Sequence, residues 1–246
     1  MIVRSVQEGW EIVFHSAHGL LAQSLASKLQ ISDEIPFWFE TQVAIGTHDD
    51  RKLEFKLGQQ IYLTEAGAPR DFTLVPMDDA TRICEASMQI EHAFRKHQWI
   101  GLLQSVHICF LYDTESVSGE MRQLLQEEHE RQVKVLRSLA IDRECLNRSY
   151  QWMQWCDRCS LIFCCNEIPA MQRRVEIITT RDGCRYDLWQ SEAGDIHIEP
   201  WPFKEEQVEL DFEYRIVRQL RFSDDKELEI ALAASDVGVR KQRLIP

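Results

Sequence analysis

The sequence lacks any apolar run long enough to cross a lipid bilayer, and its first residues lack the basic start and apolar core of a signal peptide. It also lacks a basic excess: 28 Lys and Arg stand against 40 Asp and Glu, a net charge of −12. Nucleic acids and anionic membranes are bound through basic patches, so we expect neither as a partner. From these absences we expect a cytoplasmic protein.

Several signatures of enzyme chemistry are absent as well. The sequence contains no glycine-rich phosphate loop, no nucleophile elbow and no His-Glu-x-x-His zinc motif. It also contains no internal repeat and no low-complexity tract.

Eight cysteines are present, and four of them lie close together at Cys156, Cys159, Cys164 and Cys165. In a reducing compartment we expect free thiols rather than a disulfide framework. The Cys-x-x-Cys pair is a rival candidate for a zinc site, but structural zinc sites usually gather thiolates from turns. These four fall in one apolar segment with a helical pattern, so we expect them to pack as small hydrophobic side chains.

The hydrophobic pattern predicts an α+β protein that is mainly helical and forms a single domain over residues 1–246. Residues 1–14 have the pattern of a β-hairpin, residues 15–168 that of successive helices, and residues 172–222 that of short strands. Residues 223–246 are predicted to be a polar tail or helix. Because strand-like segments lie at both ends, we expect the hairpin and the C-terminal strands to form one small antiparallel sheet.

Asp157 is the first pointer to a functional site, because it lies in a segment that is apolar almost all round. A buried carboxylate is costly unless it is paired or bound to a metal. Pairing with Arg158, or with a neighbouring helix or backbone group, therefore stays open beside metal binding. His18 lies on the same predicted helix face as Leu21, so we expect its ring to point inward.

The segment Ala44-Ile45-Gly46-Thr47-His48-Asp49-Asp50 adds two further donors. On a helix His48 and Asp49 would diverge by about 100°, yet both can reach one ion in a cleft between helices. Together the candidate ligands offer nitrogen and oxygen donors, a set that suits Fe, Mn, Zn or Mg better than a soft metal. The candidate donors are His18, His48, Asp49 and Asp157.

This order of His, His-Asp and Asp resembles the pattern of the HD-domain superfamily of metal-dependent phosphohydrolases. The resemblance is the reason to join the four residues, and it implies that His18, His48, Asp49 and Asp157 are metal ligands. Further motifs occur along nearly the whole chain: Trp10, Ala17-His18, Ala44-Ile45 before His48-Asp49-Asp50, Gly67-Ala68-Pro69-Arg70-Asp71-Phe72, Leu102-Leu103 before His107, Cys156-Asp157 with Ser160-Leu161, and Pro200-Trp201-Pro202-Phe203. Together they resemble an uncharacterised bacterial and archaeal family related to HD domains. The resemblance implies an HD-like helical bundle and a metal site, but no particular substrate.

The chain departs from that family directly after the His-Asp pair. Members usually continue with Asp-Gly-Trp, whereas Asp50-Arg51-Lys52 stands here. Lys52 matches the lysine of His-Asp-x-x-Lys in some phosphodiesterase branches, where it lies near the phosphate. A solvated surface lysine is the alternative interpretation.

The resemblance implies a metal-dependent hydrolase that acts on a phosphoester or another small anionic substrate through a metal-activated water. It would bind a divalent ion, or two, and its candidate catalytic residues are Asp50, His107 and Lys52. Asp50 would orient a ligand, His107 would bind a second ion or act as a general acid, and the candidate substrate-binding residues are Arg51 and Arg70. The alternatives are an HD-type di-iron oxygenase and a non-enzymatic protein that binds a metal or a small ligand.

Overall fold

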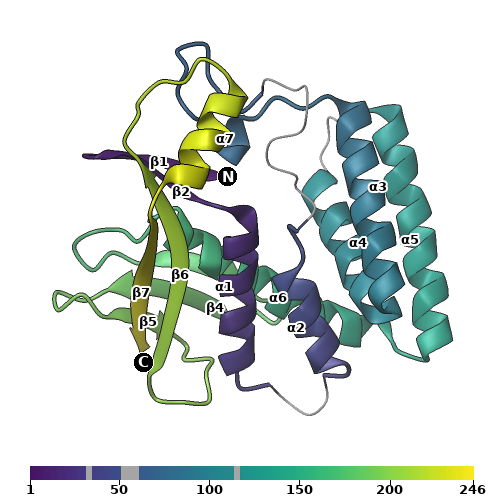
Figure 1. Ribbon diagram of the computed structural model, residues 1–246. Coiled ribbons are helices and arrows are strands. Elements are labelled where there is room, and N and C mark those ends of the chain that lie inside the picture. The colour runs from purple at the N-terminus through teal and green to yellow at the C-terminus, as the bar shows by residue number, and fades with distance from the viewer. Residues whose placement is uncertain (32–34, 51–60, 114–116) are drawn as a thin grey trace.

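The chain folds into helices that pack against a curled sheet, as a computed structural model shows for residues 1–31, 35–50, 61–113 and 117–246 (Figure 1). The helices of these residues are α1 (His15–Lys28), α2 (Trp38–Gly46), α3 (Asp79–Lys96), α4 (Gln98–Tyr112), α5 (Gly119–Leu139), α6 (Arg143–Cys164) and α7 (Asp225–Ala234), with a 3-10 turn η1 at Phe72–Leu74. The strands are β1 (Ile2–Val6), β2 (Gly9–Val13), β3 (Val175–Thr179), β4 (Arg185–Gln190), β5 (Ile196–Glu199), β6 (Val208–Val217) and β7 (Val237–Ile245). No helix among the described residues is both long and apolar enough to cross a membrane.

Polar side chains set the start of four helices. The carboxylates of Asp78, Asp142 and Asp224 accept hydrogen bonds from backbone N–H groups in the first turns of α3, α6 and α7. The hydroxyl of Ser118 does the same for α5. Each cap pairs a donor that has no partner within its own helix, which favours a helix start at that residue.

The helical pattern over residues 79–112 contains two helices, α3 and α4, which meet at His97. This residue has an extended backbone (φ −165°, ψ 147°), and its ring accepts a hydrogen bond from the N–H of Trp99 at 3.2 Å. His97 therefore ends α3 and caps α4. Apolar periodicity alone does not reveal the break, because Ala93 before it and Trp99 after it are both buried in the same core.

The strands form a seven-stranded sheet in the order β1-β2-β6-β7-β5-β4-β3. Neighbouring strands are antiparallel except β5 and β7, which are parallel. The N-terminal hairpin joins the C-terminal strands where Trp10 of β2 pairs with Val217 of β6. The two ends of the chain thus contribute to one sheet.

The predicted fold class, a mainly helical HD-like bundle with a small antiparallel sheet, is wrong. The sheet has seven strands, is mixed, and curls into a half-barrel that forms a large part of the molecule (Figure 1). The segment 223–246, predicted to be a tail or helix, contains α7 but also β7, which lies between β6 and β5. The sequence conceals β7 because Arg240 and Gln242 occupy its half-buried face where apolar residues are usual.

Two apolar cores lie on opposite sides of the hairpin. The main core joins α1, α4 and α6 to the sheet, and its largest buried side chains include Leu25, Trp99, Trp155 and Phe163. Val13 of β2 contributes to this core, whereas its neighbour Ile12 points to the other face and packs in a second core with residues of α7.

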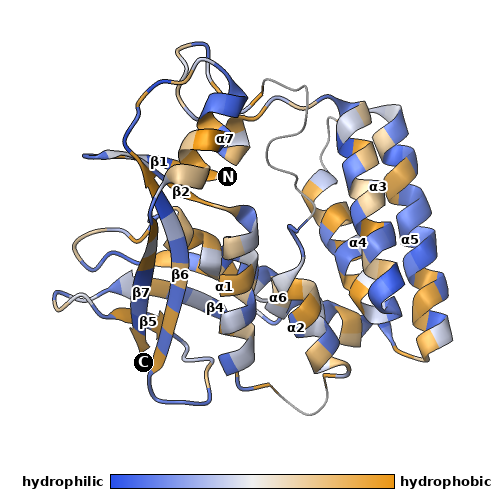
Figure 2. Ribbon diagram, viewed as in Figure 1, coloured by the Kyte–Doolittle hydropathy of each residue, from blue (hydrophilic) through white to orange (hydrophobic). Residues whose placement is uncertain are grey.

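In Figure 1, α3, α4 and α5 lie beyond α2 and α6 as seen from the sheet. Figure 2 shows polar and apolar residues on different sides of α3, α5 and α7, as expected for helices with one buried face.

Candidate metal site

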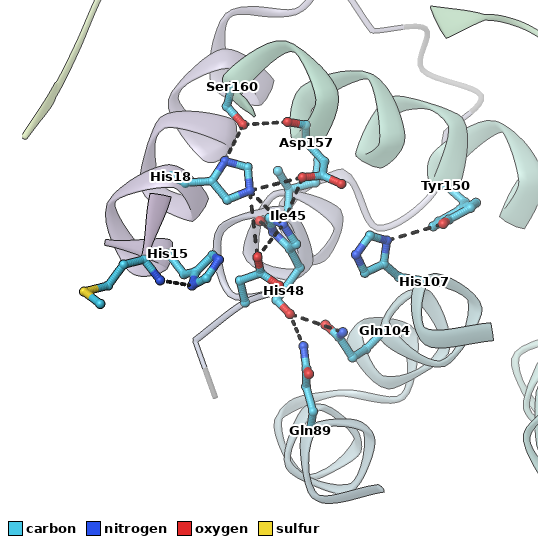
Figure 3. A network of polar contacts seen from close by, with 12 residues as sticks. His15, His18, Ile45, His48, Gln89, Gln104, His107, Tyr150, Asp157 and Ser160 are labelled. Atoms are coloured by element: carbon cyan, nitrogen blue, oxygen red, sulfur yellow. Dashed lines mark hydrogen bonds and ion pairs between the residues drawn. The ribbon is translucent and has the colours of Figure 1, made fainter. Parts of the chain in front are cut away.

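The four predicted ligands lie at the junction of α1, α2 and α6. Figure 3 labels three of them, His18, His48 and Asp157. His18 projects from α1 and Asp157 from α6, while His48 and Asp49 follow the C-terminal end of α2. Because α2 ends at Gly46, His48 and Asp49 are not separated by the angle that a helix would impose. Both can therefore face His18.

A close approach of α1 and α2 brings the two histidines together. Gly19, next to His18, lies so close to α2 that a Cβ atom there would be 2.7 Å from the carbonyl oxygen of Gly46. A side chain at position 19 would therefore push the two helices apart. The glycine sets the separation of His18 and His48.

Three atoms of the site form a nearly equilateral triangle. Nε2 of His18 is 3.2 Å from Nε2 of His48, and Oδ1 of Asp157 is 3.1 Å and 3.2 Å from these two nitrogens. Oδ2 of Asp49 lies slightly farther away, 3.9 Å and 3.8 Å from the same nitrogens. Ligands bound to one ion at about 2.0–2.2 Å are separated from each other by about 3.0–3.5 Å, so the triangle has the dimensions of a metal site.

Hydrogen bonds at Nδ1 of His18 and His48 determine whether Nε2 of each ring carries a proton or a lone pair. Nδ1 of His48 lies 2.6 Å from the carbonyl oxygen of Ile45, which can only accept, so this nitrogen carries a proton. The hydroxyl of Ser160 donates to the backbone oxygen of Asp157, so it accepts from Nδ1 of His18 at 2.9 Å. In the neutral form both rings therefore direct a lone pair from Nε2 towards Asp157, and that is the tautomer a metal requires.

Burial and charge set the protonation of the cluster. The histidine side chains are 1% exposed, Asp49 is 8% exposed, and Asp157 is the most open at 19%. Burial lowers the pKa of His48, but the carboxylates of Asp49 and Asp157 outweigh it and raise that pKa to about 9. Burial likewise opposes the charge of Asp157, yet His48 and His18 hold its pKa well below the usual range. Without an ion, a proton on His48 thus offsets part of the negative charge.

His107 of α4 lies at the edge of this cluster. One potential ligand atom each from His48, His107 and Asp157 lie within 4.8 Å of one another, as do those of His18, His48 and Asp49. The His48 and His107 rings meet edge to face with centroids 5.3 Å apart. Nδ1 of His107 is 3.3 Å from the hydroxyl of Tyr150 on α6. The structure therefore brings His107 to the four predicted ligands.

Two glutamines secure the loop that carries His48. The side-chain amides of Gln89 on α3 and Gln104 on α4 both donate to the backbone oxygen of His48, Gln104 at 3.4 Å (Figure 3). Both glutamines are buried. Gln89, Tyr150 and the acceptor role of Ser160 were not anticipated from the sequence. The sequence signal for Gln89 is a glutamine on an otherwise apolar face of a predicted helix.

The other predicted site residues are placed differently. Asp50 is exposed directly after Asp49, and its backbone N–H bonds the carbonyl of Thr47. Arg70 lines a separate pocket formed with Gly67, Arg221, Phe222 and Asp225, and none of the four predicted ligands lines that pocket. Arg51 and Lys52 lie outside the described residues.

Contacts in the structure argue against the two alternatives, an ion pair between Asp157 and Arg158 and a zinc site formed by cysteines. Arg158 forms an ion pair with Glu167 at 3.0 Å, so the partners of Asp157 in this structure are the two histidines. All eight cysteines are described and are free thiols. Cys156, Cys159 and Cys164 are buried in the main core, where burial raises the pKa of each thiol. Among the described residues no cysteine belongs to a group of candidate metal ligands.

The fold and the site define a protein with helices on a curled mixed sheet and a buried histidine–aspartate cluster that can hold a metal ion. The chain belongs to a family of proteins of unknown function, DUF3891, whose model matches residues 1–219. The expected membership in an uncharacterised family is thereby confirmed. No curated protein and no solved structure matches the chain. These comparisons supply no link to the HD-domain superfamily.

Proposed function

We propose that this protein is a metal-dependent hydrolase of a phosphoester or another small anionic substrate. The observation that carries the proposal is the triangle of His18 Nε2, His48 Nε2 and Asp157 Oδ1, whose atoms lie 3.1–3.2 Å apart. Each histidine is fixed from behind by a hydrogen bond at Nδ1. Such second contacts are typical of histidines that bind metals.

A relation to the HD-domain superfamily is part of this proposal. Its support is the order of the ligands along the chain, His18, then His48-Asp49, then Asp157, with all four side chains in one cluster. The shared order concerns the site alone. The curled seven-stranded sheet is a feature that the HD resemblance did not lead us to expect.

The chemistry follows from the donor set. A divalent cation in such a site lowers the pKa of a water molecule and offsets the charge of an anionic substrate. His18, His48, Asp49 and Asp157 would hold it with two nitrogen and two carboxylate donors, a combination that suits Zn, Mn or Fe better than Mg. Asp157 is the most exposed of the four side chains, so solvent and substrate would reach the cluster from its side.

Two cationic residues close to the His-Asp pair in the sequence are the basis for proposing an anionic substrate. Arg51 and Lys52 directly follow Asp50 in the sequence. Arginine and lysine side chains are common partners of phosphoryl groups, so these two residues stay the proposed substrate-binding cations. Arg70 has no part in the proposal, because it lines another pocket.

Metal analysis of the purified protein followed by hydrolysis assays tests the proposal. We expect about one equivalent of a transition metal per chain, and turnover of p-nitrophenyl phosphate or bis-p-nitrophenyl phosphate that a chelator abolishes and Mn²⁺ or Zn²⁺ restores. The His18→Gln variant should lose both metal and turnover. His129→Gln is the matched control, because His129 is exposed on α5 outside the cluster.

The outcomes separate the alternatives. Bound metal without hydrolysis of any phosphate ester would favour a binding protein and contradict the proposed activity. A visible iron absorption band with oxygen-dependent turnover would favour the oxygenase. Failure to bind Zn²⁺, Mn²⁺ or Fe²⁺ at all would refute the metal site and the hydrolase with it.

A further inference from the structure

His107 has two different neighbours on its two ring nitrogens. Nδ1 lies 3.3 Å from the hydroxyl of Tyr150, and the ring is placed between Tyr150 and the cluster (Figure 3). The opposite nitrogen, Nε2, is on the side of the ring that faces His48. His107 and Tyr150 are both buried, at 2% and 7% exposure. The contact with Tyr150 therefore takes place largely away from water.

The partner at Nδ1 decides what Nε2 offers. A neutral imidazole carries one proton and one lone pair, so a donor at Nδ1 leaves the proton on Nε2. A tyrosine phenol is protonated at neutral pH, and a buried hydroxyl needs an acceptor. Among the described residues, the hydrogen-bond partner of the Tyr150 hydroxyl is Nδ1 of His107. The phenol thus donates to Nδ1, and the ring proton lies on Nε2.

This arrangement is the reverse of that in the two neighbouring histidines. Nδ1 of His48 donates to the carbonyl of Ile45, and Nδ1 of His18 donates to the hydroxyl of Ser160. When these two rings are neutral, as a bound cation requires, their Nε2 atoms carry lone pairs, whereas Nε2 of neutral His107 carries a hydrogen. The cluster thus contains two histidines, His18 and His48, whose Nε2 can bind a cation, and a third, His107, whose Nε2–H can donate a hydrogen bond.

We propose that Tyr150 is a positioning residue that fixes His107 as the Nε2–H tautomer, so that His107 donates a hydrogen bond to an anionic oxygen of the substrate and binds no second metal ion. This inference rests on the proposed function, and it excludes the second-ion role that the resemblance left open for His107. The closeness of His48, His107 and Asp157, within 4.8 Å, is then the spacing of a substrate site beside the metal site. A fixed N–H beside a cation stabilises a negatively charged oxygen held between them.

The first experiment reads the tautomer itself and needs neither a metal nor activity. ¹⁵N-histidine NMR of the metal-free native protein should show His107 with a protonated Nε2 and an unprotonated Nδ1, with His107→Gln used to assign its signals. Tyr150→Phe should remove this preference, because the phenol donor is lost. A protonated Nδ1 in the native protein would overturn the inference, whatever the protein hydrolyses.

The second experiment measures Mn²⁺ stoichiometry and inorganic phosphate binding to the Mn²⁺-loaded protein. The native protein should bind one ion per chain, and His107→Ala should keep that ion while its phosphate affinity falls about tenfold or more, the typical effect of losing a hydrogen bond to a charged group. His107→Gln should recover part of the affinity, because its amide also donates. Tyr150→Phe should weaken phosphate binding with the ion retained, whereas Tyr214→Phe, a phenol on β6, should change neither.

Two results would contradict the inference in different ways. Two ions in the native protein and one in His107→Ala would make His107 a metal ligand. Unchanged phosphate affinity in His107→Ala, in a variant whose thermal unfolding matches the native protein, would remove its role towards the substrate. Absence of any bound ion in the native protein would instead refute the proposed function and the substrate role with it, while the NMR result would still decide the tautomer.

Discussion

Replacing Asp157 by Asn separates the two roles of this carboxylate, as a partner of a protonated histidine and as a metal ligand. The substitution keeps the shape of the side chain and removes its charge. Asp157 lies 3.2 Å from Nε2 of His48 and 3.1 Å from Nε2 of His18. Loss of the Asp157 charge therefore changes the stability of the ion-free protein and also its affinity for metal. The two effects depend differently on pH.

The stability effect follows from the pKa of His48, which the folded protein raises from 6.5 to about 9. One pKa unit corresponds to about 1.4 kcal/mol, so protonated His48 contributes about 3 kcal/mol to the folded state. Asp157 is the nearer of the two carboxylates that raise this pKa, at 3.2 Å against 3.8 Å for Asp49. Burial lowers this pKa, and the charge of Asp49 is the largest of the effects that raise it. Asp157 adds its own charge and a hydrogen bond to the ring, so loss of Asp157 should remove roughly half of that free energy, on the order of 2 kcal/mol. Because the folded pKa is raised, the contribution is complete below about pH 6.5 and is lost as the pH rises through about 9.

Urea unfolding of ion-free protein should therefore show Asp157→Asn about 2 kcal/mol less stable than the native chain at pH 6, and nearly equal to it at pH 10. With saturating Mn²⁺ the native protein should gain stability at both pH values, and the variant should gain little. Loss of an outer partner of a metal ligand costs about 10–100-fold in affinity, so loss of a direct carboxylate should cost about 100-fold or more. Asp236→Asn, an exposed carboxylate between α7 and β7, is the control.

The result that would refute this reasoning is a variant with native Mn²⁺ affinity and stoichiometry and a stability loss that does not change with pH. Asp157 would then be a structural residue. A loss of metal without any stability change in the ion-free protein would keep the ligand assignment, but it would contradict the charge interaction with His48.

Three further perturbations test other parts of the structure. Ser160→Ala removes the acceptor for Nδ1 of His18 and should weaken Mn²⁺ binding about 10–100-fold in a calorimetric titration, with stoichiometry unchanged; native affinity would show that this hydrogen bond does not orient the ring. Mn²⁺ competes with the proton on His48, so affinity should rise with pH up to about 9 with release of a proton per ion, and a flat profile in buffers of different ionisation enthalpy would contradict the raised pKa. Gly101→Ala places a methyl group against the ring of Phe94 where α3 and α4 pack, and urea unfolding should report about 1–3 kcal/mol of destabilisation, with equal stability disproving the tight contact.

The HD resemblance joins the four predicted ligands, and local patterns in the sequence indicate two of them, but neither predicts the geometry of the cluster. His18 was expected to point inward from its helix face, and Asp157 was singled out because a carboxylate in an apolar helix needs a partner. Both expectations depend on local patterns. The end of α2 before His48 and the approach of α1 to α2 at Gly19 depend on packing between distant segments, which no local pattern records.

The same distinction explains the wrong fold class. The short strands of residues 172–222 have alternating apolar residues and were recognised. β7 was not, because it places Arg240 rather than an apolar residue on its inner face. That guanidinium pairs with the buried carboxylate of Glu11 from β2 and lies over the ring of Tyr214. Arg240 meets these partners only after β2, β6 and β7 have come together. The sequence around Arg240 therefore does not identify it as a strand residue.

The place of the N-terminal hairpin in the sheet also constrains the order of folding. β2 pairs with β6 through Trp10 and Val217, which are separated by nearly the whole chain, so this ladder forms only after β6 has been synthesised. Until then the hairpin has an unpaired edge, and the main core under it has apolar surface that the later strands will cover. Contacts so distant in sequence make folding slow and leave intermediates prone to aggregation. Chains interrupted before β6 should therefore be targets for chaperones or proteases rather than stable fragments, even though every predicted metal ligand is already present in them.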